Sequence, residues 1–192
     1  MTTLNLERAP PHIFLEHEEH CKCGCGAYDD DRCGRPDCPH ACYTDNWNMP
    51  CVYIMVGLPG SGKSTIAKGI AAQAMAHSHD AIIHSTDNYF MDNGTYRFNR
   101  DHLGRNHKRN QEAFKKSVRD RVHTIIVDNT NLVPKDRRVY AEYAKIGKFR
   151  VVYIVVGTFG EEAVVKCFAD NTHNVPLDAI NRMAMRAHIP GD

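Results

Sequence analysis

One stretch decides the fold of this chain: Gly57-Leu58-Pro59-Gly60-Ser61-Gly62-Lys63-Ser64-Thr65. It matches the phosphate-binding loop pattern G-x-x-x-x-G-K-[ST] at every specified position. The apolar, β-branched run from Cys51 to Val56 predicts a buried strand before it, and apolar residues at helical spacing predict a helix behind it up to about His77. A glycine loop in this setting presents backbone N–H groups and a helix N-terminus to an anion. The stretch therefore predicts binding of a nucleoside triphosphate such as ATP.

The loop residues have distinct expected roles. Lys63 is expected to reach the β- and γ-phosphates, and the Ser64 hydroxyl is expected to bind Mg²⁺. The alternative, a glycine-rich turn with a chance lysine, does not account for the strand and the helix on either side. The predicted nucleotide-binding residues are Gly60, Ser61, Gly62, Lys63, Ser64 and Thr65.

Length and composition indicate an ordinary globular protein. The 192 residues suffice for one full core and a small appendage, and the hydrophobic and charged shares are 42% and 24%. The longest apolar runs are too short for a membrane span, and the N-terminus lacks a signal-peptide pattern. We therefore expect no membrane association, and a location in the cytoplasm or the nucleus.

Charge and cysteine content divide the chain at about residue 50. Residues 1–50 carry four Lys/Arg and nine Asp/Glu, a net charge of −5, whereas residues 51–192 carry 20 and 14, a net charge of +6. Six of the eight cysteines lie between Cys21 and Cys42. We predict a small Cys/His-rich module over residues 1–50 and a second domain over residues 51–192, whose positive charge suits a partner that carries phosphates.

The Cys/His-rich module is a candidate zinc site. Disulfides are not expected in a reducing compartment, and the segment has too few large apolar residues to be held together by burial, so a structural Zn²⁺ would supply the folding free energy. The spacing does not match the common C-x2-C…C-x2-C pattern, which leaves the choice of ligands open. A redox-sensitive or disordered cysteine-rich tail is the alternative. The candidate ligands are Cys21, Cys23, Cys25, Cys33, Cys38, His40 and Cys42.

The first twenty residues show no convincing apolar period and predict a loosely ordered arm, or a flank of the zinc module. The module is also a candidate surface for a protein partner.

From residue 51 onward, apolar runs alternate with helical patterns. This alternation predicts an α/β fold with a parallel sheet and helices on both faces, and ligands in such sheets lie beyond the carboxyl ends of the strands. We expect the second strand to lie next to the first. The predicted strands cover residues 51–56, 81–85, 124–127 and 149–156, and the predicted helices cover residues 63–77, 101–121, 134–147, 161–170 and 176–188, with one helical turn over residues 87–91.

Polar residues follow the second and third strands. Asp87 is a candidate general base for an attacking hydroxyl or a ligand of Mg²⁺ through water, and the alternative is an N-cap of the short helix. Asp128 is a candidate to help hold Mg²⁺, and Asn129 and Asn131 are candidate substrate contacts. Turn chemistry in front of Pro134 is the alternative for this group, and it stands equal to function for Asn131.

The long middle helix carries both polar and basic residues. Three polar residues, His107, Asn110 and Gln111, fall on the same stripe as the apolar residues Leu103, Phe114 and Val118. They are therefore candidates to line a substrate groove, although a semi-buried structural histidine is the alternative for His107. Residues 97–121 contain nine Lys/Arg and three Asp/Glu. A solvated helix face and a phosphate-tracking surface are both open interpretations of this charge.

Four ordered motifs resemble the polynucleotide-kinase-type phosphate-loop kinases. They are GLPGSGKST at 57–65, HSTDNYF at 84–90, IIVDNTN at 125–131 and NVPLDAINRM at 174–183. FMDNGTYRF at 90–98 with NHKRNQ at 106–111 resembles the AAA-type relatives of that family, and the resemblance covers about residues 52–188. It implies a central parallel sheet with a helical lid, and transfer of the ATP γ-phosphate to a 5′-hydroxyl of RNA or DNA or to a smaller acceptor.

The resemblance also implies roles for single residues. Lys63 and Ser64 would hold nucleotide phosphate and Mg²⁺, Asp87 would be the general base for the acceptor hydroxyl, and Asn129 would contact the acceptor end. In the lid, Lys166 matches one expected basic position, but Asp170 stands where an arginine is common. The candidates to replace that arginine are Lys166, His173, Arg182 and Arg186.

The sequence thus predicts an ATP- and Mg²⁺-dependent kinase for a nucleic-acid 5′-hydroxyl. A kinase for a nucleoside or another small metabolite is the first alternative. An ATP-binding interaction module with little turnover is the second.

Overall fold

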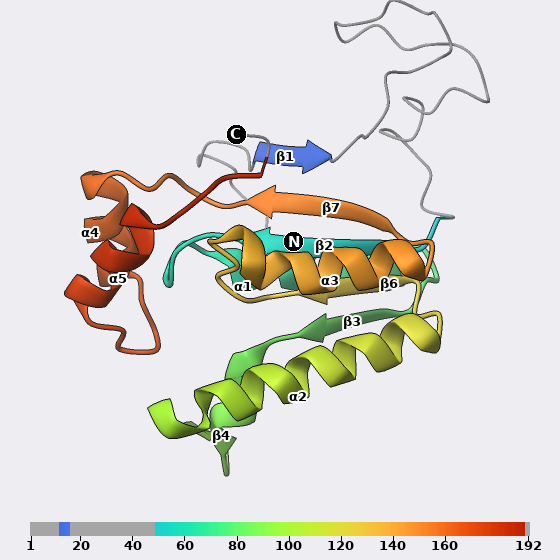
Figure 1. The fold of residues 1–192 in the computed structure, drawn as a ribbon, viewed down its shortest axis with the longest axis horizontal. Helices are drawn as coiled ribbons and strands as arrows, with labels where there is room; N and C mark the ends of the chain where they lie inside the picture. Colours follow the sequence, from blue (N-terminus) through green and yellow to red (C-terminus); the bar gives the residue numbers. More distant parts are fainter. Residues whose placement is uncertain (1–11, 16–48, 191–192) are drawn as a thin grey trace, which may run out of the picture.

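Five short strands form the central sheet of the protein (Figure 1). The computed structural model describes residues 12–15, of which only the backbone is described, and residues 49–190. Four strands run parallel to one another and the remaining edge strand is antiparallel to its neighbour. The spatial order is β1 (His12–Leu15), β7 (Arg150–Val155), β2 (Cys51–Val56), β6 (Thr124–Val127) and β3 (Ala81–His84).

The second strand of the main domain does not lie next to the first. β6 separates them, because Ile125 of β6 is in register with Val52 of β2 on one side and with Ile82 of β3 on the other. The expectation that β2 and β3 are neighbours is therefore wrong. The crossover through helix α1 skips one strand position, and the later, fully buried strand β6 fills it.

The antiparallel edge strand comes from the segment that the sequence predicts to be a loosely ordered arm. Residues 12–15 instead pair with β7, with His12 opposite Val155 and Leu15 opposite Val152. This prediction is therefore wrong for β1. The candidate zinc ligands between Cys21 and Cys42 lie outside the described residues, so the zinc module stays a prediction.

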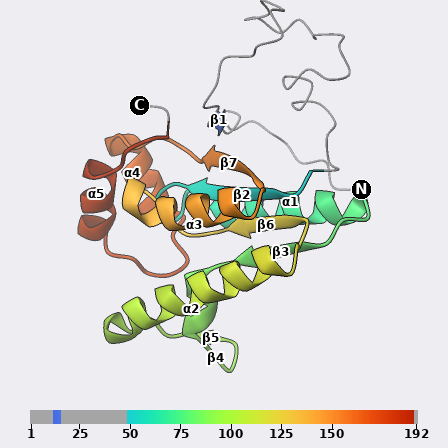
Figure 2. The same cartoon turned by 45° about the vertical axis from the view of Figure 1, so that its right-hand side comes forward.

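Helices cover both faces of the sheet, as predicted (Figures 1 and 2). α1 (Lys63–Ala76) packs on one face, and α2 (Arg100–Arg119) and α3 (Pro134–Ile146) pack on the other. Alternate residues of β2 serve the two faces: Val52 and Ile54 contact the α2–α3 side, and Met55 contacts the α1 side. Burial on both faces explains why the strand is a continuous apolar run rather than an alternating one.

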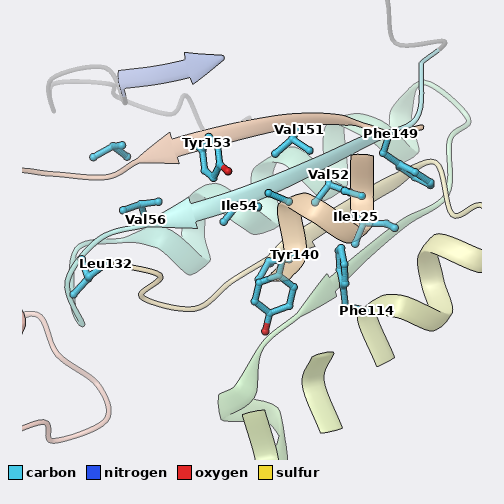
Figure 3. Close-up of a cluster of buried hydrophobic side chains, with 14 of the residues drawn as sticks. Val52, Ile54, Val56, Phe114, Ile125, Leu132, Tyr140, Phe149, Val151 and Tyr153 are labelled. Atoms are coloured by element: carbon cyan, nitrogen blue, oxygen red, sulfur yellow. The ribbon is translucent and has the colours of Figure 1, made fainter. Parts of the chain in front are cut away.

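The larger core cluster lies between the sheet and the helices α2 and α3 (Figure 3). Phe114 of α2 meets Tyr140 of α3 edge to face, with ring centroids 5.0 Å apart, and both side chains are buried. The Phe114 ring packs against strand residues such as Ile125 in the same cluster. Truncation of such a buried aromatic ring to alanine costs about 3–5 kcal/mol, so this contact fixes α2 and α3 on the sheet.

The remaining elements gather at the carboxyl ends of the parallel strands (Figures 1 and 2). The last helix is shorter than the predicted 176–188, and α4 and α5 pack against each other. Within the described ranges 12–15 and 49–190, no helix is long and apolar enough to cross a membrane. The elements at this end are η2 (Thr86–Phe90), the hairpin β4 (Met91–Asp92) and β5 (Thr95–Tyr96), α4 (Glu161–Ala169) and α5 (Leu177–Met185).

Candidate active site

The glycine loop connects β2 to α1, as the sequence predicts. Gly60 and Gly62 have φ values of 80° and 93°, a left-handed conformation that glycine adopts without steric cost. Lys63 opens α1 and is 8% exposed, and its Nζ donates a hydrogen bond of 2.6 Å to the carbonyl oxygen of Leu58. This hydrogen bond connects the end of the loop, at Lys63, to Leu58 near its start.

Gly60 also touches the segment that the resemblance implies to be the lid, which consists of α4, α5 and the loop between them and is called the lid below. A Cβ atom on Gly60 would lie 2.0 Å from the carbonyl oxygen of Cys167, in α4, and 3.1 Å from the backbone nitrogen of Asn171. No side chain fits in this space, so the lid backbone packs directly on the phosphate-binding loop. The motif predicts a glycine here for its backbone conformation, whereas the packing against α4 is visible only in the structure.

Asp128 follows β6 and lies beside the loop. Burial raises the pKa of its carboxyl, while a hydrogen bond from the Ser64 hydroxyl and the charge of Lys63 act in the opposite direction. Burial also lowers the pKa of Lys63, and the charges of Asp128 and Asp87 are among those that oppose this shift. A hydroxyl and a carboxylate in contact are oxygen donors of the kind that Mg²⁺ prefers, so Ser64 and Asp128 fit the predicted magnesium role.

Asp87 lies in the first turn of η2, past the end of β3. It does not cap this turn, because the Ser85 hydroxyl is the N-cap and accepts the hydrogen bond from the Asp87 N–H. The N-cap interpretation of Asp87 is therefore wrong, and its carboxylate is used elsewhere. Oδ1 accepts a hydrogen bond of 3.1 Å from the Tyr96 hydroxyl, and Oδ2 lies 3.7 Å from Nε2 of His173.

The two asparagines after β6 hold the backbone around the site. Asn129 Oδ1 accepts a hydrogen bond of 2.9 Å from the Thr86 N–H, and its Nδ2 donates to the Tyr140 hydroxyl at 3.4 Å. Asn131 is buried with a φ of 46°, and its Nδ2 donates to the carbonyl of Met55 at 2.8 Å. These contacts favour the turn interpretation for Asn131, while Asn129 lies beside the residue that precedes Asp87.

The inward face of α2 differs from the predicted stripe. The side chains of Asn106 and Asn110 are buried, and each residue is 1% exposed, whereas His107 is exposed to solvent. Its Nδ1 is still 3.0 Å from the Thr86 hydroxyl. The prediction of an inward-facing His107 is wrong, because η2 packs on the helix through Asn106, whose Nδ2 donates to the Tyr89 carbonyl at 3.2 Å.

The lid brings a histidine to Asp87 rather than an arginine. Lys166 is exposed on α4, and Arg182 forms an ion pair of 2.6 Å with Asp178 one turn earlier in its own helix. His173, between α4 and α5, is the candidate that contacts Asp87.

The sequence does not single out Tyr96, although it carries one local signal for it. Asn93-Gly94 between β-forming residues is a hairpin signal, and a hairpin returns Tyr96 to the vicinity of η2.

Comparisons with known proteins identify the family of the chain. Residues 52–190 match the family model AAA_33, described as an AAA domain. The chain belongs to this family. Over 130 residues, 68% of the chain, it is 32% identical to the Homo sapiens NEDD4-binding protein 2, but it spans only 7% of that protein.

Two solved structures share the fold of the present chain. Chaetomium thermophilum Kti12, in complex with ADP-AlF3, aligns with a TM-score of 0.52 and 17% identity, covering 73% of the present chain and 81% of Kti12. A chain of the Pnkp1/Rnl/Hen1 RNA repair complex aligns with a TM-score of 0.50 and 19% identity, covering 72% of the present chain and 44% of the other. The resemblance to polynucleotide-kinase-type P-loop kinases is thereby confirmed at the level of family and fold: the chain is an AAA domain with a P-loop kinase-like fold.

Proposed function

We propose that this protein is an ATP- and Mg²⁺-dependent kinase that transfers the γ-phosphate to the 5′-hydroxyl of a nucleic acid. One observation carries the proposal: Asp87 and Lys63 both follow the carboxyl ends of parallel strands, β3 and β2, and so lie at the same end of the sheet. The charge of Asp87 also acts to raise the pKa of Lys63, against the larger effect of burial. Phosphoryl transfer needs these two parts together, a cationic site for the phosphates and a carboxylate that accepts the proton of the attacking hydroxyl.

Each residue of the site has its own role in the proposed reaction. Lys63 has three N–H donors: one goes to the Leu58 carbonyl at 2.6 Å and one to the Ser61 hydroxyl at 3.5 Å, which leaves the third for a phosphate oxygen. Ser64 and Asp128 would hold Mg²⁺, which when bound neutralises charge on the phosphates. Asp87 accepts the proton of the acceptor hydroxyl. Positioning and electrostatic stabilisation supply most of the acceleration in this class of reaction.

Positive charge near Asp87 supports an acceptor that carries phosphates. Residues 97–121 have a net charge of +6, and most of the basic side chains of α2 are exposed. Arg109 of this helix lies over the Tyr89 ring at 4.7 Å, and Tyr89 is two residues from Asp87. Phosphate groups of a nucleic acid bind such a surface through Arg and Lys. The likeness to a chain of an RNA repair complex agrees with a nucleic-acid acceptor.

The test is transfer of label from [γ-³²P]ATP by the full chain. We expect label at the 5′ end of 5′-hydroxyl RNA or DNA. Label on nucleosides or other small acceptors alone would support the assignment as a kinase but contradict a nucleic-acid acceptor. ATP binding without transfer to any acceptor would contradict both and favour an ATP-binding interaction module.

Asp87→Asn tests the general base. We expect it to lower the transfer rate by about 10²–10⁴-fold, since it removes the proton acceptor. Asp120→Asn is the matched control, because Asp120 follows α2 and pairs with Lys116 on the exposed surface. Equal rates for the wild type and Asp87→Asn would show that the general-base assignment is wrong.

The Cys/His-rich segment carries a separate proposal, a structural zinc site that supports contact with a protein partner. It rests on the ligand residues between Cys21 and Cys42, which lie outside the part of the chain that the structure describes. Metal analysis of the full chain, purified without chelator, is expected to give about one Zn²⁺ per chain. Less than about half an equivalent would contradict it.

A further inference from the structure

The Tyr96 side chain is held in a fixed place beside Asp87. Its ring packs against Phe90, which is 4% exposed, with centroids 6.1 Å apart, and against the His173 ring at 4.2 Å. Phe90 belongs to η2 and His173 to the lid, so two separate elements clamp the ring. A tyrosine held on two sides directs its hydroxyl to one point, and that point is Asp87 Oδ1.

The hydroxyl is a donor in this contact. Burial raises the pKa of Tyr96, and the charge of Asp87 and the hydrogen bond to it act in the same direction, so the phenol keeps its proton. Asp87 is about half exposed, and a hydrogen bond to a carboxylate is roughly twice as strong as one between neutral groups. The bond therefore fixes the rotation of a carboxylate that would otherwise turn freely in solvent.

The hydrogen bond from Tyr96 gives the two carboxylate oxygens of Asp87 different surroundings. Oδ1 is occupied by Tyr96, and Oδ2 faces the lid, 3.7 Å from His173. The lid loop at this place is itself ordered, because Asn171 Oδ1 accepts from the His173 N–H and Asn171 Nδ2 donates to the Val175 carbonyl. A general base needs one oxygen within reach of the acceptor proton, and Oδ2 is the oxygen that remains.

We propose that Tyr96 is a positioning residue for the general base: its hydroxyl anchors Oδ1 of Asp87 so that Oδ2 receives the proton of the acceptor hydroxyl. This inference rests on the proposed phosphotransferase function. It goes beyond that function by assigning the β4–β5 hairpin a role in the reaction through Asp87. The acceptor proton moves to Oδ2 as the phosphorus–oxygen bond to the acceptor forms and the bond to ADP breaks, and Tyr96 keeps its own proton.

The first test is a double-mutant cycle of Tyr96→Phe and Asp87→Asn, read as kcat and as KM for ATP. Tyr96→Phe is expected to lower kcat about 10-fold, through the loss of one charged hydrogen bond, while KM for ATP stays at the wild-type value and the melting temperature falls by a few degrees at most. In the Asp87→Asn background the same change is expected to have no further effect. Tyr143→Phe is the control, because the Tyr143 hydroxyl contacts Arg119 on the exposed side of α3.

The outcomes separate the two claims. An active wild type with an equally active Tyr96→Phe variant overturns the positioning role and leaves the kinase intact. Equal losses from Tyr96→Phe in both backgrounds also overturn it, since a purely structural effect does not depend on the Asp87 carboxylate. A wild type that phosphorylates no acceptor refutes the proposed function, and the positioning role fails with it.

The contact itself has a readout that does not depend on activity. In protein labelled with [¹³Cζ]tyrosine, the Tyr96 signal is the one that disappears in Tyr96→Phe. We expect Asp87→Ala to move this signal at neutral pH and Asp120→Asn to leave it unchanged. A Tyr96 signal that stays in place in Asp87→Ala would show that the hydrogen bond is absent and overturn the inference.

Discussion

The side-chain oxygen of Asn129 accepts a hydrogen bond from the backbone N–H of Thr86, with 2.9 Å between the two atoms. Asn129 follows β6 and Thr86 follows β3, so the bond ties together the ends of two adjacent parallel strands. Each strand is followed by one acidic residue of the candidate site, Asp128 after β6 and Asp87 after β3. The bond therefore sets the position of the proposed general base relative to the proposed magnesium ligand.

Asn129→Ala is expected to affect transfer more than ATP binding. The variant leaves the N–H of buried Thr86 without its acceptor, which costs about 1–3 kcal/mol of unfolding free energy, and it frees η2 to shift. Urea unfolding and steady-state kinetics measure the two effects. Asn88→Ala, an exposed residue of the same turn, is the control. A variant with wild-type stability and wild-type kcat would contradict the role of this bond.

Lys63→Met is expected to slow phosphate transfer strongly and to weaken ATP binding without unfolding the protein. Methionine keeps most of the buried chain volume but removes the charge, and loss of a charged group that stabilises the transition state costs about 10²–10³ in rate. Lys116→Met, on the exposed surface of α2, is the control, because Lys116 pairs with Asp120 outside the site. The measurements are isothermal titration with an ATP analogue and the labelled-phosphate assay. A transfer rate in Lys63→Met equal to that of the wild type would contradict the assignment of this loop.

Gly60→Ala and Gly69→Ala are expected to have opposite effects on stability. A Cβ at Gly60 meets the Cys167 carbonyl at 2.0 Å and requires a strained backbone, so the variant should displace α4 and lower the melting temperature. A Cβ at Gly69 meets nothing within 4 Å on an exposed helix, so alanine there should stabilise by about 0.5–1 kcal/mol. Thermal and urea unfolding decide the signs. Equal stability of Gly60→Ala and the wild type would contradict the packing of the lid on the loop.

His84 is expected to make the protein less stable in acid. Burial lowers the pKa of His84 to about 4 in the folded protein, where its Nε2 lies 2.9 Å from the Ser117 hydroxyl, whereas the unfolded chain binds the proton near pH 6.5. The neutral His84 therefore contributes fully to the free energy of unfolding above about pH 6.5. This contribution is lost as the pH falls toward 4, and the free energy of unfolding decreases by about 2 kcal/mol between pH 7 and pH 4.5.

The check is urea unfolding of His84→Gln across this pH range. The variant should lose less stability than the wild type on acidification, because it no longer has the group whose protonation differs between the two states. His102→Gln, on the exposed surface of α2, should behave as the wild type does. The same pH dependence in the wild type and His84→Gln would exclude this residue as the cause.

Much of the fold follows from local chemistry. The glycine loop, the apolar strands β2 and β6 and the helix that Pro134 opens were predictable, because phosphate loops, buried parallel strands and helix starts each need particular residues at fixed spacing. The same local rules identified Asp87 and Asp128, since the carboxyl ends of parallel strands meet at one edge of a sheet.

Strand order was not predictable in this way. Nothing in Ala81–His84 states which strand it pairs with, and β6 separates it from β2 only because the crossovers through α1 and α2 leave that position open. The pairing of residues 12–15 with β7 was not predictable for a similar reason. A short edge strand needs only backbone hydrogen bonds, and most side chains allow these, so the residue types in the segment do not mark it as a strand.

The sequence by itself determined the phosphate-binding loop and the acidic residues at the strand ends, because each depends on residues close together in the chain. Only the tertiary structure decided what surrounds Asp87. Tyr96 comes from a hairpin and His173 from the lid, and the inward turn of Asn106 in place of His107 depends on how η2 packs on α2. These contacts join residues far apart in the sequence, and the packing of whole elements, rather than any local pattern, sets their distances.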